Sequence, residues 1–288
     1  ILDTELGDDW RLGSASRWWL HHSLASLRAA LAAQGVELIL RAGDIATNLV
    51  DLVKETGANY IYCSRHYQPW AESLEVDVRE AVTTVGATLK RYPGTLLHEP
   101  ETVATGSGTP FKVFTPFWRA CNRLHEPSHP APAPELLPFQ QTVQSEDLDD
   151  WQLTPKPPNW AFGWNDLWQP GEVGGQATLA QFLSNNVQNY SHGRDIPAEP
   201  NTSRLSPYLR FGNISPRQVW HAAQATKIER HNGADAIDKF LSELGWREFC
   251  YHLLFHFPSM PDEAFNPKFS FFPWMEDSAR LKAWQSGL

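Results

Sequence analysis

Apolar residues near the start of the chain recur with the period of a helix, and short apolar runs follow them. The first pattern predicts a helix over residues 14–34, with Ser14 or Ser16 as its N-cap and Gly35 just beyond its end. The apolar positions of this helix are Trp19, Leu20, Leu24, Leu27 and Leu31.

The next part of the chain alternates between apolar runs and helical patterns. Strands are predicted at residues 36–40, 59–63 and 88–90, and helices from Gly43-Asp44 to Thr56 and over residues 75–85. Strands that alternate with helices pair in parallel through right-handed crossovers. Residues 1–123 are therefore predicted to form an α/β domain with a doubly wound parallel sheet, whose first strand or two would precede Ile1.

Proline and acidic residues dominate residues 124–172, as in the runs EPSHPAPAPELLPF and TPKPPNW. This composition is typical of a linker that lies on the surface, partly in a polyproline-like conformation. Its tryptophans are expected to fix it at points. They are Trp151, Trp160, Trp164 and Trp168.

Residues 173–288 change class, because the patterns in them are helical. Helices are predicted over residues 178–190 and 235–257, with further starts at Ser206-Pro207 and Ser215-Pro216. Proline is favoured at the first helical position, and Gln218 completes a capping box with Ser215. The sequence therefore predicts an all-α second domain.

Composition and charge narrow the class of protein. The net charge is −9, most of it in residues 1–170, which argues against sequence-independent coating of nucleic acid. A local basic rim in the second half stays open, and its candidates are Arg194, Arg204, Arg210, Arg217 and Arg247. The sequence has no apolar run of about 18 residues, so no membrane span is expected. The three cysteines form no C-x-x-C pair, and we expect a protein of the reducing cytoplasm with no metal site.

The stretch from Asn189 to Trp220 carries the main signal for chemistry. A polar loop in it holds His192-Gly193-Arg194-Asp195 and then Thr202-Ser203-Arg204-Leu205-Ser206, and the two Ser-Pro helix starts follow. Hydroxyls and free backbone N–H groups at helix starts bind phosphate. The stretch is a candidate seat for a phosphate-bearing ligand, although Ser-Pro caps and Thr-Ser loops also occur for structural reasons alone.

The same stretch resembles the flavin-binding segment of DNA photolyases and cryptochromes. The run that carries the resemblance is Tyr190…Gly193-Arg194-Asp195…Thr202-Ser203-Arg204-Leu205-Ser206-Pro207…Phe211-Gly212-Asn213-Ile214-Ser215. The resemblance implies a Rossmann-like antenna domain and an all-α FAD-binding domain, incomplete here, with FAD as the cofactor. It also implies three kinds of contact. The FAD diphosphate would be held by Tyr190, Thr202, Ser203, Leu205 and Ser206, with charge added by Arg204, and DNA phosphate would be contacted by Arg194.

A second resemblance lies in Glu243-Leu244-Gly245-Trp246-Arg247-Glu248-Phe249, which is similar to the E-L-x-W-R-E-F helix of the family. It implies that Glu243 and Trp246 meet a flipped pyrimidine dimer and that Arg247 lies beside the flavin. An enzyme that acts on a base extrudes it, stacks it on an aromatic ring and hydrogen-bonds its edge, and Trp and Glu supply these groups. The residues alone also fit a buried Trp beside an exposed Glu.

The resemblance extends to further segments. Residues 109–118 are similar to the segment that closes the antenna domain, and Trp274 matches the surface end of the family's tryptophan electron chain. Where some relatives hold a folate with an Asn-Glu pair and a Lys, this chain has Trp70-Ala71 and Asp262. A second, antenna chromophore therefore stays unidentified, and a deazaflavin, another pigment or none are left open.

The sequence thus most resembles a bacterial class I-type cyclobutane pyrimidine dimer (CPD) photolyase, truncated at both ends. The function this implies is light-driven repair, in which reduced FAD passes an electron to a flipped dimer in damaged DNA. Such an enzyme is a carbon–carbon lyase, expected to be a monomer, and this chain alone is expected to bind FAD weakly or not at all. Glu243 favours cyclobutane dimers, because relatives that repair (6-4) lesions usually have Gln there.

Three alternatives stay open. The chain could come from a cryptochrome, a blue-light photoreceptor that signals without repair, or from a (6-4) photolyase. It could also be a non-catalytic helical interaction protein with a degenerate α/β domain, which would bind no flavin.

Overall fold

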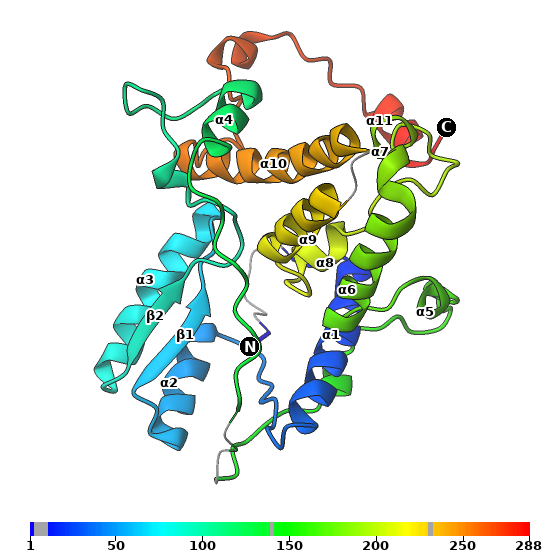
Figure 1. Cartoon of the computed structure of the whole chain (residues 1–288). Coiled ribbons are helices and arrows are strands. Elements are labelled where there is room, and N and C mark those ends of the chain that lie inside the picture. Colours follow the sequence, from blue (N-terminus) through cyan, green and yellow to red (C-terminus); the bar gives the residue numbers. More distant parts are fainter. Residues whose placement is uncertain (3–10, 137, 139–140, 230–232) are drawn as a thin grey trace.

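The computed structural model describes residues 1–2, 11–136, 138, 141–229 and 233–288 (Figure 1). The first part of the chain forms α1 (Ser14–Ala32), α2 (Ile45–Thr56), β1 (Tyr60–Ser64), α3 (Pro69–Thr84), β2 (Thr88–Tyr92), η2 (Pro100–Thr102) and α4 (Phe114–Cys121). The middle forms η3 (Leu148–Trp151), α5 (Trp164–Leu167), α6 (Glu172–Gln181), the π-helical turn η4 (Phe182–Asn186), η5 (Val187–Asn189) and α7 (Tyr190–Gly193). The last part forms α8 (Ser206–Arg210), α9 (Pro216–Glu229), α10 (Ala234–His256), η6 (Pro267–Phe271) and α11 (Ser278–Gln285).

The α/β part is built around a parallel pair of strands. β1 and β2 pair in parallel, with Tyr60 opposite Thr88. The crossover between them is α3, which packs with α2 against the strands around Val53, Val78 and Val82. Parallel pairing through a helical crossover confirms the α/β prediction for this region.

The prediction of a strand at residues 36–40 is wrong. Residues 36–40 carry no strand assignment, and a parallel bridge, between Leu2 and Ala42, lies just beyond them. Backbone groups of this segment bind the linker instead: the N–H of Leu40 donates to Ser145 Oγ at 2.9 Å, and its carbonyl accepts from the N–H of Glu146 at 2.8 Å. The backbone N–H and carbonyl of Leu40 are therefore paired with a side chain and a loop of the linker. Hydrophobic periodicity alone does not reveal such partners.

Helix α1 belongs to the helical half as much as to the α/β half, and it lies beside α6 in Figure 1. Trp18 and Trp19 are buried in the largest core of the molecule. Trp19 Nε1 also donates to Asn213 Oδ1 at 2.9 Å, and Ser23 Oγ donates to the same atom at 3.2 Å. The domain boundary placed at residue 123 by the sequence stays a prediction, and this contact crosses it.

That largest core is drawn from α1 and from the helices between α6 and α10. Its buried members include Leu179, Phe182, Val187, Tyr208, Ile214, Val219, Ile237, Phe240, Leu241 and Leu244. The 23-residue helix α10 runs across this core, and Figure 1 shows α4 lying against one side of it.

Several local predictions can be compared with the structure. The capping box at the start of α9 is confirmed: Ser215 N–H donates to Gln218 Oε1 at 2.8 Å, and Gln218 N–H donates to Ser215 Oγ at 3.1 Å. The caps expected for α1 and α8 are wrong, because Gly13 and Leu205 occupy these N-cap positions and neither supplies a side-chain bond. The helix predicted over residues 178–190 is broken into α6, η4, η5 and α7. Among the described residues, no helix has the length and apolar character needed to cross a bilayer.

Candidate functional site

The candidate phosphate seat lies at the point where the chain leaves α7 and enters α8. Tyr190 is buried, with its ring edge-on to Phe182 and Phe240 at centroid distances of 5.5 Å each. Burial, followed by the charge of Glu243, raises the pKa of its phenol. Leu205 is also buried and fixes the far end of the loop in the core.

The hydroxyls of this loop are largely uncommitted. Thr202 and Ser206 are exposed, and within the described part of the chain no hydrogen bond is formed by either hydroxyl. Ser203 Oγ accepts only a long bond of 3.5 Å from the N–H of Leu205. Free hydroxyls on a loop anchored at both ends can turn toward an added anion, so the residues present fit a diphosphate.

A close backbone approach ties this loop to α7. A Cβ placed on Gly193 would lie 2.3–2.7 Å from side-chain atoms of Asn201. Asn201 is buried and its amide donates to Glu199 Oε2 at 2.6 Å, so it has little room to move. The glycine of the Gly193-Arg194-Asp195 motif is therefore needed so that residues 199–203 can lie against α7.

Arg204 has an unusual backbone conformation, and its side chain packs on the linker. Its φ of 55° lies in the left-handed region, which costs a non-glycine residue of order 1 kcal/mol. Its guanidinium lies over the ring of Trp168 at 4.0 Å from the centroid. The structure thus places Arg204 on the linker, whereas sequence reasoning gave it to the phosphate seat.

Arg194 and Glu243 are brought together from distant parts of the sequence. Arg194 Nη1 forms an ion pair with Glu243 Oε1, and Lys239 Nζ lies 2.9 Å from the same oxygen. Burial lowers the pKa of Arg194, but the hydrogen bond and charge of Glu243 outweigh burial, and the pKa is raised. Both side chains are about one quarter exposed, at 26% and 28%, so the pair stands at a solvent-facing rim.

Trp246 follows Glu243 by one turn of α10 and is 43% exposed. Its ring stacks on Phe114 of α4, with centroids 3.8 Å apart and planes 9° apart. Glu243, its partner Arg194 and the ring of Trp246 lie near one another at this end of the site. The resemblance to the family implied this proximity for Glu243 and Trp246.

Arg247 is directed toward the loop after β2 in the α/β half. Its Nη1 donates to the carbonyl of Thr95 at 2.6 Å, and its guanidinium lies over Tyr251 at 4.9 Å. The structure therefore does not bring it to Tyr190 and the phosphate seat. It lines instead a cavity of about 410 Å³ between the α/β half and the loop from α8 to α9.

Glu248 is a buried carboxylate that the sequence reasoning missed. Its Oε2 accepts from the N–H groups of Leu97 at 2.8 Å and His98 at 3.2 Å, joining α10 to the loop after β2. Burial raises its pKa to about 7, against the opposing effects of Arg247 and the two N–H donors. Position 248 falls on the same face of α10 as Ile237, Leu241, Leu244 and His252. This helical spacing is a sequence signal that predicts burial of Glu248.

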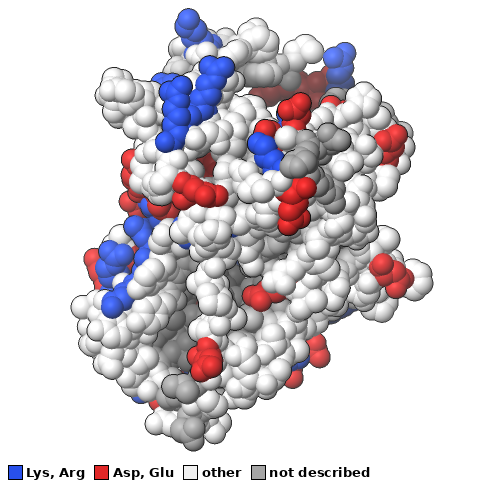
Figure 2. All heavy atoms as spheres, in the orientation of Figure 1, with Lys and Arg blue, Asp and Glu red and all other residues white. Residues whose placement is uncertain are grey.

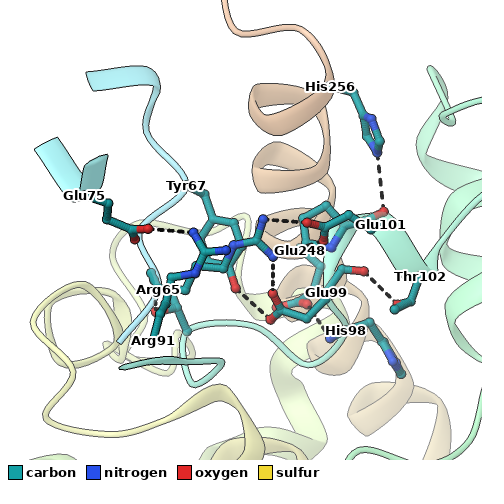
Figure 3. A network of polar contacts seen from close by, with 12 residues as sticks. Arg65, Tyr67, Glu75, Arg91, His98, Glu99, Glu101, Thr102, Glu248 and His256 are labelled. Atoms are coloured by element: carbon teal, nitrogen blue, oxygen red, sulfur yellow. Dashed lines mark hydrogen bonds and ion pairs between the residues drawn. The ribbon is translucent and has the colours of Figure 1, made fainter. Parts of the chain in front are cut away.

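A polar network extends from Glu248 toward the ends of the strands (Figure 3). In it Arg65 lies between two carboxylates, at 2.6 Å from Glu99 Oε2 and 2.6 Å from Glu101 Oε1. Tyr67 donates to Glu99 Oε1 at 2.7 Å. Arg65 is mostly buried and paired with both carboxylates, so this cluster joins the loop after β1 to η2.

Trp274 stands apart from the other candidates. It is 74% exposed, and its nearest ring partner is Phe272 at 4.7 Å. The segment around it, from Phe265 to Trp284, exposes most of its aromatic side chains. The structure therefore agrees with a surface position for Trp274 and places no inner ring next to it among the described residues.

Several basic candidates contact other side chains of this chain. Arg210 lies over Phe211 at 5.9 Å, Arg204 over Trp168, and Arg194 is paired with Glu243. On the face drawn in Figure 2, basic side chains stand mainly in the upper and left parts and are mixed with acidic ones.

Comparison with known proteins connects these features. Residues 1–135 match the family model described as DNA photolyase, and residues 240–288 match the one described as FAD binding domain of DNA photolyase. The chain belongs to the photolyase and cryptochrome family.

Individual relatives support the same family. A deoxyribodipyrimidine photo-lyase of Agrobacterium fabrum is 42% identical over 96% of this chain, and cryptochrome-1 of Arabidopsis thaliana is 31% identical over 96% of it. The solved structure of a bacterial class III photolyase from Agrobacterium tumefaciens superposes with a TM-score of 0.93 over 100% of this chain at 42% identity. The chain spans 58%, 41% and 59% of these proteins, respectively.

These comparisons confirm the fold class expected from the sequence, an α/β part followed by a helical one. The finer placement in class I stays a prediction, since the photolyase with the 0.93 score is described as class III. The roles of individual residues also stay predictions, because similarity of whole chains does not assign them.

Proposed function

We propose that the protein performs light-driven repair of cyclobutane pyrimidine dimers in DNA, as a deoxyribodipyrimidine photo-lyase. The observation that carries this proposal is the ion pair of Arg194 with Glu243 one helical turn from the half-exposed ring of Trp246. These groups supply a cation for DNA phosphate, a hydrogen-bonding carboxyl and a stacking face. Enzymes that act on an extruded base need this set.

FAD is the cofactor in this proposal. The residues that would hold its diphosphate are Tyr190, Thr202, Ser203, Leu205 and Ser206, and the hydroxyls of Thr202 and Ser206 are free to bind an anion. When bound and reduced, FAD supplies a light-driven electron donor, and the protein contributes position and electrostatics. Arg204 and Arg247 would assist from farther away, because their guanidinium groups lie over Trp168 and beside Thr95.

The side chains at the rim have separate roles in the proposal. Trp246 stacks on the flipped dimer, and Glu243 hydrogen-bonds a pyrimidine carbonyl and stabilises the negative charge that gathers there. Arg194 contacts a phosphate beside the lesion. This phosphate would compete with Glu243 for the guanidinium, so DNA binding would rearrange the ion pair. Trp274 would deliver electrons from the surface, consistent with its 74% exposure.

The remaining expectations belong to the same proposal. We infer that damaged DNA is the partner, that the protein acts as a monomer, and that it works in the cytoplasm. Support for a reducing compartment comes from Cys63, Cys121 and Cys250, which are all free. A second, antenna chromophore is included without an identity, and no metal site is proposed.

The test is a spectrum followed by a repair assay on the full-length protein. The purified protein should show flavin absorbance and, under blue light, should restore thymine absorbance in dimer-containing oligothymidylate. Flavin without repair would move the function to a cryptochrome-type photoreceptor or to (6-4) lesions. Absence of flavin would reject the proposal.

A further inference from the structure

Trp246 is the outer ring of an aromatic ladder that crosses from α10 to α4. Its plane lies 9° from that of Phe114, and the plane of Phe114 lies 11° from that of Trp118. The centroid separations are 3.8 Å and 6.4 Å. Three nearly parallel rings therefore lie near one another, and Trp246 is in face-to-face contact with Phe114 and half-exposed.

We propose that Phe114 is the positioning residue for lesion binding, holding Trp246 with one face covered so that an extruded pyrimidine adds as the next ring on the open face. This inference rests on the proposed function of Trp246. The inference goes beyond that proposed function, because it assigns the orientation of the Trp246 ring to Phe114, a residue of the α/β half.

The physical reason is conformational entropy. A side chain as exposed as Trp246 would lose rotamer freedom on stacking against a base, and that loss weakens binding. Contact with Phe114 removes part of this freedom before DNA arrives. Parallel aromatic pairs contribute beyond their buried area, so the ring of Phe114 is the group that matters.

Phe114 is itself held by a core that leaves it little freedom. It packs edge-on to Phe249 at 5.9 Å, within the cluster that buries Phe117, Cys121 and Val103. The position of α4 therefore determines the position of the Trp246 ring, through the stack of that ring on Phe114.

The third ring is fixed by a close approach of α4 to α10. A Cβ on Gly245 would lie 2.6–2.8 Å from ring atoms of Trp118. This contact exists only because position 245 carries no side chain. Gly245 sits directly before Trp246 in the chain, so the packing that seats Trp118 also fixes the backbone from which the platform projects.

The experiment compares variants of the full-length protein by affinity in the dark for oligothymidylate with and without one cyclobutane dimer. Phe114→Leu should lower the ratio of the two affinities by about threefold to tenfold, whereas Phe114→Tyr, which keeps the ring, should retain it. Phe111→Leu is the matched control, because Phe111 packs in the same cluster against Phe117 at 6.2 Å and its recorded ring contacts are with Phe117 and His252. It should leave the ratio within about twofold even if it lowers stability.

A double-mutant cycle shows whether Phe114 acts through Trp246. In a Trp246→Ala background, Phe114→Leu should cause no further loss of discrimination. An unchanged ratio in Phe114→Leu, an equal loss in Phe111→Leu, or a full loss in the Trp246→Ala background would each overturn the inference. If the wild type shows no preference, or if Trp246→Ala alone leaves the ratio unchanged, the proposed function fails first.

Discussion

The guanidinium of Arg194 is paired with the carboxylate of Glu243, although the two residues lie far apart in sequence. Lys239 reaches the same oxygen at 2.9 Å, so Glu243 accepts two cations at the rim. A carboxylate held by two cations keeps one of them when the other turns away.

Replacing Glu243 by Ala is expected to lower repair per absorbed photon several-fold, with a smaller effect on dimer binding. The lost group would hydrogen-bond a carbonyl that becomes charged during repair, and bonds to charged groups contribute about 1.5–3 kcal/mol. The measurement is the quantum yield of repair together with the dissociation constant. Asp195→Ala is the control, since it removes the other carboxylate near Arg194, at 3.4 Å, and leaves Glu243 in place. An unchanged yield in Glu243→Ala would remove this residue from the chemistry.

Replacing Trp246 by Ala is expected to weaken binding of dimer-containing DNA more than binding of undamaged DNA. Base–aromatic stacking contributes about 1–3 kcal/mol per base, and only a flipped lesion would use this ring. Titration of both oligonucleotides by fluorescence anisotropy measures the difference. Equal losses for the two would mean that Trp246 stabilises the surface and does not contact the lesion.

Replacing Gly193 by Ala is expected to reduce retention of FAD. The added methyl group would overlap the buried Asn201 and push residues 199–203 away from α7, with an overpacking cost of about 1–3 kcal/mol. The readouts are the flavin-to-protein absorbance ratio and the melting temperature. Gly106→Ala serves as the control, because nothing lies within 4 Å of its added Cβ. Full flavin occupancy in Gly193→Ala would contradict the seat described above.

Glu248 is expected to make stability depend on pH. Its pKa is about 7 in the folded protein and starts from a usual value of 4.5, so the unfolded chain loses this proton first as pH rises. The contribution of Glu248 to the free energy of unfolding should therefore fall between about pH 4.5 and pH 7, by an amount of order 3 kcal/mol for a shift of this size. His252, with a pKa lowered to about 4 by burial, acts in the opposite direction, since its contribution is lost as pH falls below 6.5.

Denaturant unfolding at pH 5 and pH 8 isolates the contribution of Glu248 when wild type is compared with Glu248→Gln. The glutamine cannot ionise, so the difference between the two proteins should shrink toward the acid side. A difference that is the same at both pH values would show that the carboxyl group is already ionised in the folded state throughout.

Sequence reasoning succeeded where the signal is local. Ser215 and Gln218 lie three positions apart, and their capping box depends on nothing else, so it was predicted and is confirmed. It failed where distant segments decide the outcome. Residues 36–40 read as a strand, but Ser145 and Glu146 of the linker bind the backbone of Leu40.

The site shows the same division. Glu243 and Trp246 share a helix, so their proximity follows from spacing. The stack of Trp246 on Phe114 joins segments separated by the linker and several helices, and no pattern in either segment indicates it. Arg247 likewise follows Trp246 directly, yet its partner is the carbonyl of Thr95 on the other half of the molecule.

The burial of α1 in the helical core has a consequence for synthesis. Trp19 finds Asn213 only after another 194 residues have been made. At roughly 5–20 residues per second, the tryptophan face of α1 waits on the order of 10–40 s on the ribosome before its partners emerge. The amino-terminal part of the nascent chain therefore cannot bury that face as an independent unit, and during that interval it is a natural target for chaperones that bind exposed aromatic surface.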